Sequence, residues 1–260
     1  MIYISDSLVL SPTVPLRNSR IGYDTITFGA TPFASSTDTG FSALAPTYPT
    51  TYEYWKPVST PATWAIDTAT ETKCDFAGIV GDIEGVTIQV QSSEDNVTYV
   101  THVEGVATKK VAMFLFASIG ARFWRVRFVN GNPKVSVIYI GKALPMQRSI
   151  YVGHSPITLS RNTTYNNTLS ENGQFLGRSI IRGGVQTNAA FQHLKADWYR
   201  ANFDPFVKFA REYPFFFAWR PEGAPDEVGF VWTNEDITPQ NTGPRDFMSV
   251  SFNMQGIGAD

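Results

Sequence analysis

Strict alternation of apolar and polar residues is the feature of this sequence that most limits its fold. It runs through residues 86–91 and returns at 124–128 and 248–254. Successive side chains of a β-strand point to opposite faces, so a period of two is typical of strands with one buried face. Residues 76–80 are instead continuously apolar, as a strand buried on both faces requires. Asn130-Gly131 supplies a hairpin turn, and we expect a mainly β protein.

One region departs from this pattern. Between residues 187 and 213 apolar side chains recur at roughly helical intervals. Asp204-Pro205 has the form of a helix start, an N-cap acceptor followed by proline at the first helical position. We therefore predict helices near 189–212, as two short pieces that meet at 203–204. Residues 215–219 are predicted to form a buried strand, with 227–232 as its hairpin partner.

Changes in residue composition and in the alternation pattern divide the chain into three parts. Residues 1–37 contain short strands and a linker, which we expect to pack on one of two larger domains. Residues 38–145 carry most of the alternating strands and are predicted to form a β-sandwich. Leu144-Pro145-Met146 interrupts the alternation, so the second β-rich domain is predicted to cover 146–260 and to include the helices.

Composition limits the classes of function. Charged residues make up 17% of the chain, below the usual value of about 25%, while aromatic residues reach 14%. This balance suits a protein that buries surface against partners, although it also fits an ordinary sandwich. The net charge is −2 and no Lys/Arg-rich run occurs, so we expect no nucleic-acid partner. No apolar stretch approaches about 18 residues, and the start lacks the pattern of a signal peptide, so neither membrane insertion nor export is expected.

Motifs for catalysis and for metal or cofactor binding are absent from the sequence. There is no Gly-x-Ser-x-Gly, no phosphate-binding loop and no dinucleotide fingerprint. The three histidines are isolated from other metal-type ligands. Two acidic pairs, at 226–227 and 235–236, stand among turn residues, which favours a structural role over glycosidase chemistry. We therefore expect no enzyme, no metal and no cofactor.

One cluster offers a possible binding site. Tyr52, Tyr54 and Trp55 lie near a predicted loop, and an aromatic face can stack on the C–H side of a sugar ring. The alternative is that Trp55 closes one end of the sandwich as a core residue. Both interpretations remain open at this point.

Residues 54–126 resemble a known family. The segments Tyr54-Trp-Lys-Pro57, Pro61-Ala-Thr-Trp-Ala-Ile-Asp67 and Phe76-Ala-Gly-Ile-Val-Gly81, together with 86–95 and 121–126, are similar to the discoidin-like (F5/8 type C, galactose-binding-like) jelly roll. The chain has Ser-Glu-Asp-Asn at the hairpin turn and Asp-Thr where that family usually has Asp-Leu-Gly. The resemblance implies a jelly-roll sandwich, and fold alone does not supply a ligand.

The second half resembles tail proteins of long-tailed phages and related gene-transfer particles, through segments such as 148–156, 173–178, 214–221 and 245–250. This resemblance implies a distal-tail or baseplate ring adaptor that joins the tail tube to the hub, located in the virion tail tip after synthesis in the host cytoplasm. The implied partners are further copies of the chain in a hexameric or trimeric ring, the tail tube protein, the hub and other tail-tip proteins. The predicted subunit interface is Phe203, Phe206, Phe215, Phe217 and Trp219. The alternative function is a carbohydrate-binding module or adhesin that contributes to attachment at the host surface.

Overall fold

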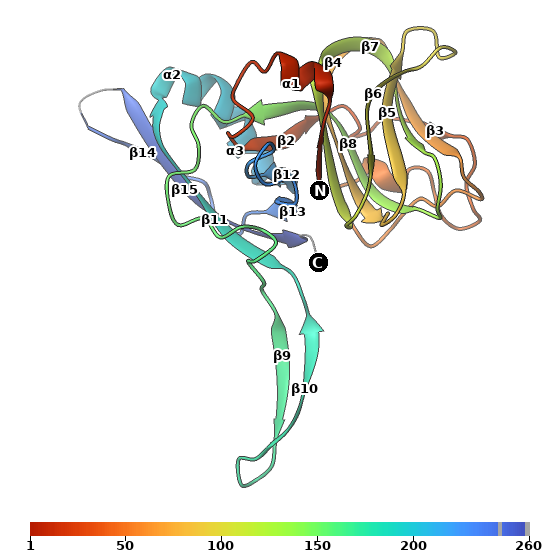
Figure 1. The fold of residues 1–260 in the computed structure, drawn as a ribbon. Coiled ribbons are helices and arrows are strands. Elements are labelled where there is room, and N and C mark those ends of the chain that lie inside the picture. The colour runs from red at the N-terminus through yellow and green to blue at the C-terminus, as the bar shows by residue number, and fades with distance from the viewer. Residues whose placement is uncertain (244–245, 258–260) are drawn as a thin grey trace.

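The computed structural model describes residues 1–243 and 246–257, and it is mainly β (Figure 1). The strands are β1 (Ile2–Ile4), β2 (Arg20–Thr25), β3 (Pro32–Ala34), β4 (Ala62–Asp82), β5 (Thr87–Ser93), β6 (Val100–Val106), β7 (Val111–Phe128), β8 (Lys134–Pro145), β9 (Thr164–Leu169), β10 (Phe175–Arg182), β11 (Val185–Lys195), β12 (Phe215–Ala218), β13 (Val228–Trp232), β14 (Pro239–Asn241) and β15 (Phe247–Ile257). The helical segments are α1 (Asp6–Leu10), η1 (Ala45–Thr47), α2 (Ala196–Trp198), η2 (Tyr199–Phe203) and α3 (Asp204–Ala210). Within the described residues no helix has the length and apolarity to cross a bilayer.

A single sheet runs through both halves of the chain. Its strand order is β11-β15-β13-β12-β2-β8-β4-β7-β5-β6, with β1, β3 and β14 paired beside β7, β4 and β15. Strand β2 joins the halves, because it pairs with β8 on one side and with β12 on the other. The division into 1–37, 38–145 and 146–260 stays a prediction, and the first part contributes strands to both larger parts.

The sandwich forms because β4 and β7 bend together. Residues 62–67 of β4 pair with 128–123 of β7, whereas 76–80 pair with 115–111, and register shifts separate these stretches. Each strand therefore contributes to two layers, which enclose a core rich in tryptophan and β-branched residues. The alternation read at 86–91 and 124–128 has its apolar face in this core, with Ile88, Val90, Trp124 and Val126 fully buried.

The second half has its own core beneath the short helices. Strands β11, β15, β13 and β12 pack their apolar faces against α2, η2 and α3. The helical prediction begins too early, since residues 189–195 belong to strand β11, where Ala189 and Phe191 are buried on alternate positions. The backbone N–H and C=O groups of this segment are hydrogen-bonded to strand β15 instead of within a helix. Segments η2 and α3 meet at 203–204, and Asp204 is the first residue of α3 rather than its cap.

A third core cluster joins the two halves. It contains Phe76, Met113 and Tyr139 from the sandwich together with Phe216 and Phe230 from the second half. The inner layer of the sandwich is thus covered on both faces, as the continuous apolar run at 76–80 predicts.

Candidate functional site

The three residues predicted to bind sugar have different environments. Trp55 is fully buried, and its indole Nε1 donates to the Ser36 carbonyl at 3.1 Å. Its ring packs near Phe128 inside the sandwich core. A ring without an exposed face cannot stack on a sugar, so the assignment of Trp55 to a binding site is corrected to a core role.

Tyr52 and Tyr54 remain accessible but do not form one platform. Tyr52 is 77% exposed. Tyr54 is half-buried, because its ring stacks on Phe41 with 4.9 Å between centroids and 21° between planes. Of the two, Tyr54 lines a cleft that Tyr52 does not.

This cleft, which we call the seam cleft, lies where the sandwich meets the last strand. It has a volume of about 390 Å³ and is lined by Thr51, Tyr54, Val80, Gly81, Asp82, Lys110, Lys134, Ser136 and Ile257. Ile257 comes from β15, so a sandwich on its own lacks one wall of the cleft. The lining combines an aromatic ring, apolar side chains and charged groups, a mixture typical of sites for small polar ligands.

Charges of both signs surround the ring of Tyr54. Lys134 Nζ lies 3.4 Å from an Asp82 carboxylate oxygen and 6.0 Å from the centre of the Tyr54 ring. Lys110 is exposed and has no ion-pair partner within the described part of the chain. Two ammonium groups and one carboxylate therefore give the cleft a formal charge of +1 when all three are ionised.

The predicted subunit interface is also corrected by burial. Phe203, Phe206, Phe215 and Phe217 are completely buried in the core of the second half. Trp219 is partly exposed and packs 4.8 Å from the ring of His154. The dense run of phenylalanines marks a core between the short helices and the sheet, so a free apolar surface has to be sought elsewhere.

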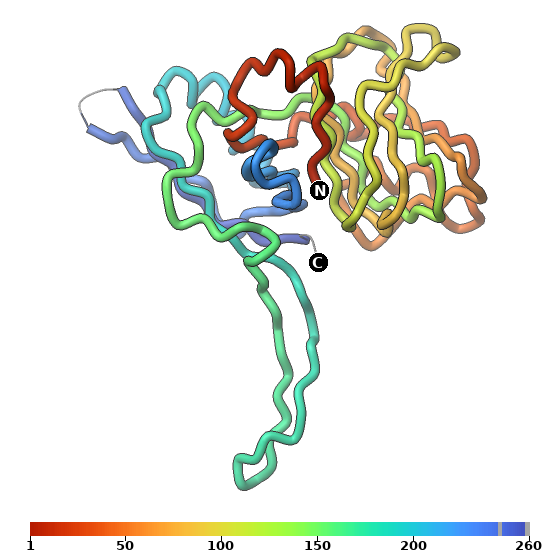
Figure 2. Tube along the Cα trace, in the orientation of Figure 1, coloured from red at the N-terminus to blue at the C-terminus, as the bar shows by residue number. Residues whose placement is uncertain are grey.

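Such a surface exists on the projecting hairpin of β9 and β10, which we call the arm. Figures 1 and 2 show it extending well away from the rest of the molecule. None of its strand residues is buried, and its two strands pair only with each other. The segment 151–181 carries nine of the 21 exposed large apolar side chains found among the described residues. The arm and its base are therefore the main exposed apolar surface.

Four of the exposed apolar side chains of the arm share one face. Tyr165 pairs with Ile180 and Leu169 with Phe175, and paired residues of an antiparallel ribbon share a face. These four side chains are 46–66% exposed. The opposite face carries polar residues, such as the pair Asn166 and Ser179.

A basic side chain lies between the apolar pairs. The Arg178 guanidinium lies 4.4 Å from the centre of the Tyr165 ring, and its Nε donates to Asn167 Oδ1 at 2.7 Å. These contacts tie the two strands together, but they provide no core. An isolated two-stranded hairpin is marginally stable in water, so this one needs a further surface to pack against.

The sequence carried a signal for the arm. Asn172-Gly173 is followed by a run rich in large apolar side chains at 175–181, and Asn-Gly is a strong hairpin signal. The polar character of residues 162–172 predicts a loop there instead of a strand. Residues 174–181 are then predicted to form a strand that has no partner strand in 162–172. The pattern alone could not show that the hairpin projects away from the other described residues (Figure 1).

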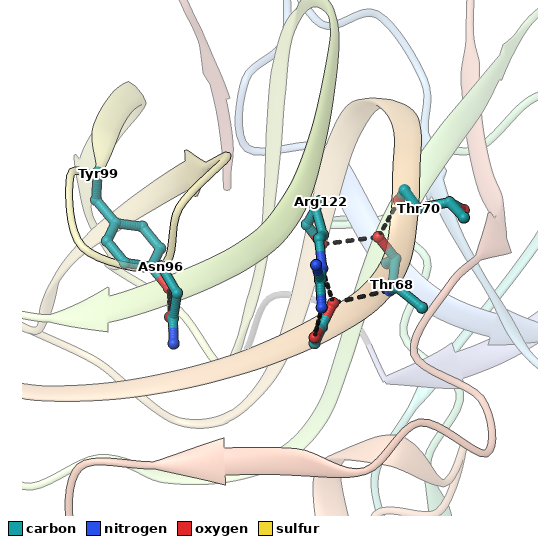
Figure 3. Close-up of polar contacts among 7 residues, drawn as sticks. Thr68, Thr70, Asn96, Tyr99 and Arg122 are labelled. Carbon is teal, nitrogen blue, oxygen red and sulfur yellow. Dashed lines mark hydrogen bonds and ion pairs between the residues drawn. The ribbon is translucent and has the colours of Figure 1, made fainter.

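The bend of β4 and β7 is held by a separate polar cluster (Figure 3). Asp67 accepts two hydrogen bonds from Arg122, each 2.8 Å, and these hold the pKa of that carboxyl at about 2. The Thr68 hydroxyl lies 2.7 Å from the carbonyl oxygens of both Thr70 and Arg122 and can donate its one proton to either. Figure 3 also shows a separate pair between β5 and β6, where the Tyr99 hydroxyl donates to Asn96 Oδ1. The groups of this cluster bond one another, which indicates a structural corner rather than a ligand site.

Two further titratable residues, His102 and Cys74, are half-buried and fully buried, respectively. The described residues contain no group of three or more His, Cys, Asp or Glu placed to hold a metal ion. His102 Nε2 lies 2.7 Å from the Ser92 hydroxyl, and burial lowers the pKa of His102. Ser92 is buried, and His102 is half-buried. Burial also raises the pKa of the Cys74 thiol.

Comparison with known proteins finds similarity in solved structures of carbohydrate-binding modules. Chitosan-binding module 1 of a chitosanase/glucanase from Paenibacillus sp. IK-5 covers 45% of this chain with 97% of its own length, at 14% identity and a TM-score of 0.41. A family 32 module of AlyQ, in complex with 4,5-unsaturated mannuronic acid, covers 46% of the chain with 96% of its length, at 12% identity and a TM-score of 0.40. A family 32 module from Clostridium perfringens, in complex with GalNAc-β-1,3-galactose, covers 43% with 94% of its length, at 12% identity and a TM-score of 0.39.

No family model matches the chain, and neither does any curated protein. These structural neighbours share a β-sandwich of the discoidin-like, galactose-binding-like type and match less than half of the present chain. At TM-scores near 0.4 the likeness does not establish what this chain binds.

Proposed function

We propose that the chain is a structural subunit that assembles with copies of itself through the arm. The observation that carries this proposal is the apolar face of Tyr165, Leu169, Phe175 and Ile180, which no described residue of the same chain covers. Burial of such side chains contributes about 25 cal/mol for each Å² removed from water. We propose a second copy of the chain as the partner, because each copy also carries another exposed apolar surface on which the arm of a neighbour can pack.

The arm base offers that second surface. Tyr151, Val152 and Leu159 are exposed, at 58–68%, in the segment that precedes the arm and lies along β11, where the Tyr151 N–H donates to the Ala190 carbonyl. In a ring built by head-to-tail contacts, each subunit needs two different patches. One patch contacts the preceding copy and the other contacts the next copy. The arm and its base meet this requirement. The tail-tip ring implied by the phage resemblance, with the tail tube protein and hub as neighbours, is the specific form of assembly that we propose.

Amide hydrogen exchange tests this proposal directly. If a neighbouring copy covers the arm, the amides of β9 and β10 exchange slowly at micromolar protein concentration and quickly after dilution into the monomeric range. The amides of β5 and β7 in the sandwich serve as the internal control, because their protection does not depend on assembly. Fast exchange of the arm at every concentration would contradict the proposal.

Carbohydrate binding is a second candidate function, and the seam cleft favours it. The cleft holds a partly exposed tyrosine ring beside hydrogen-bonding and charged side chains. The solved neighbours are themselves carbohydrate-binding modules. In an assembled particle, such a site would serve attachment to a host-surface glycan.

A glycan array tests this second candidate. Binding should be lost when Tyr54 is changed to alanine and should persist when the exposed Tyr52 is changed in the same way. If no glycan on the array is retained, or if only Tyr52→Ala reduces retention, the seam cleft is not a carbohydrate site.

A further inference from the structure

We infer that the seam cleft selects an acidic sugar, such as a uronate residue, over a neutral one. This inference rests on the second candidate function, carbohydrate binding, and adds the chemical class of the ligand. It concerns a site that the two halves build jointly, because Ile257 of β15 lies opposite the sandwich residues.

The apolar part of the cleft fits the flat face of a sugar ring. Phe41 packs against the Tyr54 ring and holds it in place. Val80 and Ile257 add aliphatic lining near this ring. A pyranose has C–H groups that can contact such surfaces, whereas its hydroxyl groups need polar partners at the rim.

The polar part of the cleft favours a carboxylate. Lys134 Nζ stands 6.0 Å from the Tyr54 ring centre, so a ligand that touches Tyr54 lies within reach of an ammonium group. Lys134 is already paired with Asp82 at 3.4 Å, but the pair is open to solvent, with the Lys134 side chain 41% and the Asp82 side chain 63% exposed. An exposed pair of this kind is worth little and is easily rearranged.

Lys110 supplies the second cation. It lines the same cleft and has no ion-pair partner in the parts of the chain that are described. A ligand carboxylate can therefore be bound by Lys110 while Lys134 bridges it to Asp82. A hydrogen bond to a charged group contributes about 1.5–3 kcal/mol, which corresponds to a preference of about tenfold or more over an uncharged ligand.

Titration calorimetry with two matched probes tests the inference. The probes are trigalacturonate and its fully methyl-esterified form, which have the same rings and differ in charge. The native chain should bind the acid at least about tenfold more tightly than the ester. Added salt should weaken binding of the acid much more than binding of the ester.

Variants assign the preference to the two lysines. Changing Lys110 and Lys134 together to glutamine should bring the affinity for the acid down to that for the ester. Lys73→Gln, which removes an exposed lysine from β4 outside the cleft, should leave the preference unchanged. Thermal unfolding of each variant checks that the fold is retained.

The possible failures have different meanings. Equal affinity of the native chain for acid and ester overturns the inference while carbohydrate binding stands. A preference that survives the double glutamine variant also overturns it, because the selecting charges then lie elsewhere. If neither probe binds, carbohydrate binding at the cleft and the inference that rests on it both fail for this class of glycan.

Discussion

The ring of Phe216 lies directly over Gly78, so close that a Cβ atom built on Gly78 would come within 2.5 Å of Phe216 Cδ2. Gly78 belongs to β4 in the sandwich, and Phe216 belongs to β12 in the second half. The glycine thus lets an aromatic ring from one half rest on the sheet of the other. This contact is part of the core cluster that makes the two halves a single packed unit.

Gly78→Ala should destabilise the protein. Both the glycine and the ring are held within paired strands, so the added methyl group forces a shift in a close-packed core, at a cost of about 1–3 kcal/mol. Urea unfolding measures the loss. Gly223→Ala is the matched control, because only a side-chain atom 4.0 Å away approaches the new Cβ there. Equal stability of the two variants would show that the halves do not depend on this contact.

Trp55→Ala should cost far more stability than Tyr52→Ala. Trp55 is fully buried, and replacing a buried tryptophan by alanine typically costs about 3–5 kcal/mol. Tyr52 is largely exposed, so its replacement should change the free energy of unfolding by no more than about 0.5 kcal/mol. Chemical unfolding followed by circular dichroism checks both values. A Trp55→Ala variant of native stability would remove Trp55 from the core.

Asp75→Asn should alter the pH dependence of stability. Burial is the main reason why the pKa of Asp75 is raised from 3.8 to about 6, although the Ala143 N–H donates to its carboxylate. Between these two values the unfolded chain loses its proton while the folded chain keeps it. The free energy of unfolding therefore falls as the pH rises through this window, by about 3 kcal/mol in total.

Asparagine cannot titrate, so Asp75→Asn should gain stability relative to the native chain as the pH rises from about 4 to about 7.5. Urea unfolding at the two pH values measures this change. A difference between the two proteins that stays constant with pH would contradict the account.

The Cys74 thiol should resist modification in the folded protein. It is fully buried, and burial raises its pKa, so little reactive thiolate forms near neutral pH. A thiol reagent at mildly alkaline pH should label it only as fast as the chain unfolds, and fully in urea. Rapid labelling of the native protein would show that β4 opens locally around this residue.

Local patterns predicted the strands well where one face is buried. The alternation at 86–91, 124–128 and 248–254 and the apolar run at 76–80 all lie in strands. The helical prediction for residues 189–195 was wrong because alanine and leucine at mixed spacings suit a helix, while pairing with β15 decides the outcome. Pairing between strands that are far apart in the sequence cannot be recognised from a short stretch of residues.

The candidate sites were harder to predict for a related reason. An aromatic residue in the sequence does not reveal whether its ring is covered. A binding role and a core role therefore both stayed open for Trp55, and the phenylalanines at 203–217 were assigned to an interface although they form a core. The arm shows the opposite case, because large apolar residues of this hairpin are exposed and are not covered by any part of the chain that the structure describes. The seam cleft depends on Lys110, Lys134 and Ile257, which come together only through the fold.

The mass of the protein in solution tests the central claim most directly. Light scattering at micromolar concentration should give a multiple of 28.9 kDa for the native chain and 28.9 kDa for a variant with Phe175→Asp and Ile180→Asp on the apolar face of the arm. Leu10→Asp, at an exposed apolar residue on α1, is the control and should assemble like the native chain. A native chain that stays at 28.9 kDa over the whole concentration range would contradict assembly through the arm.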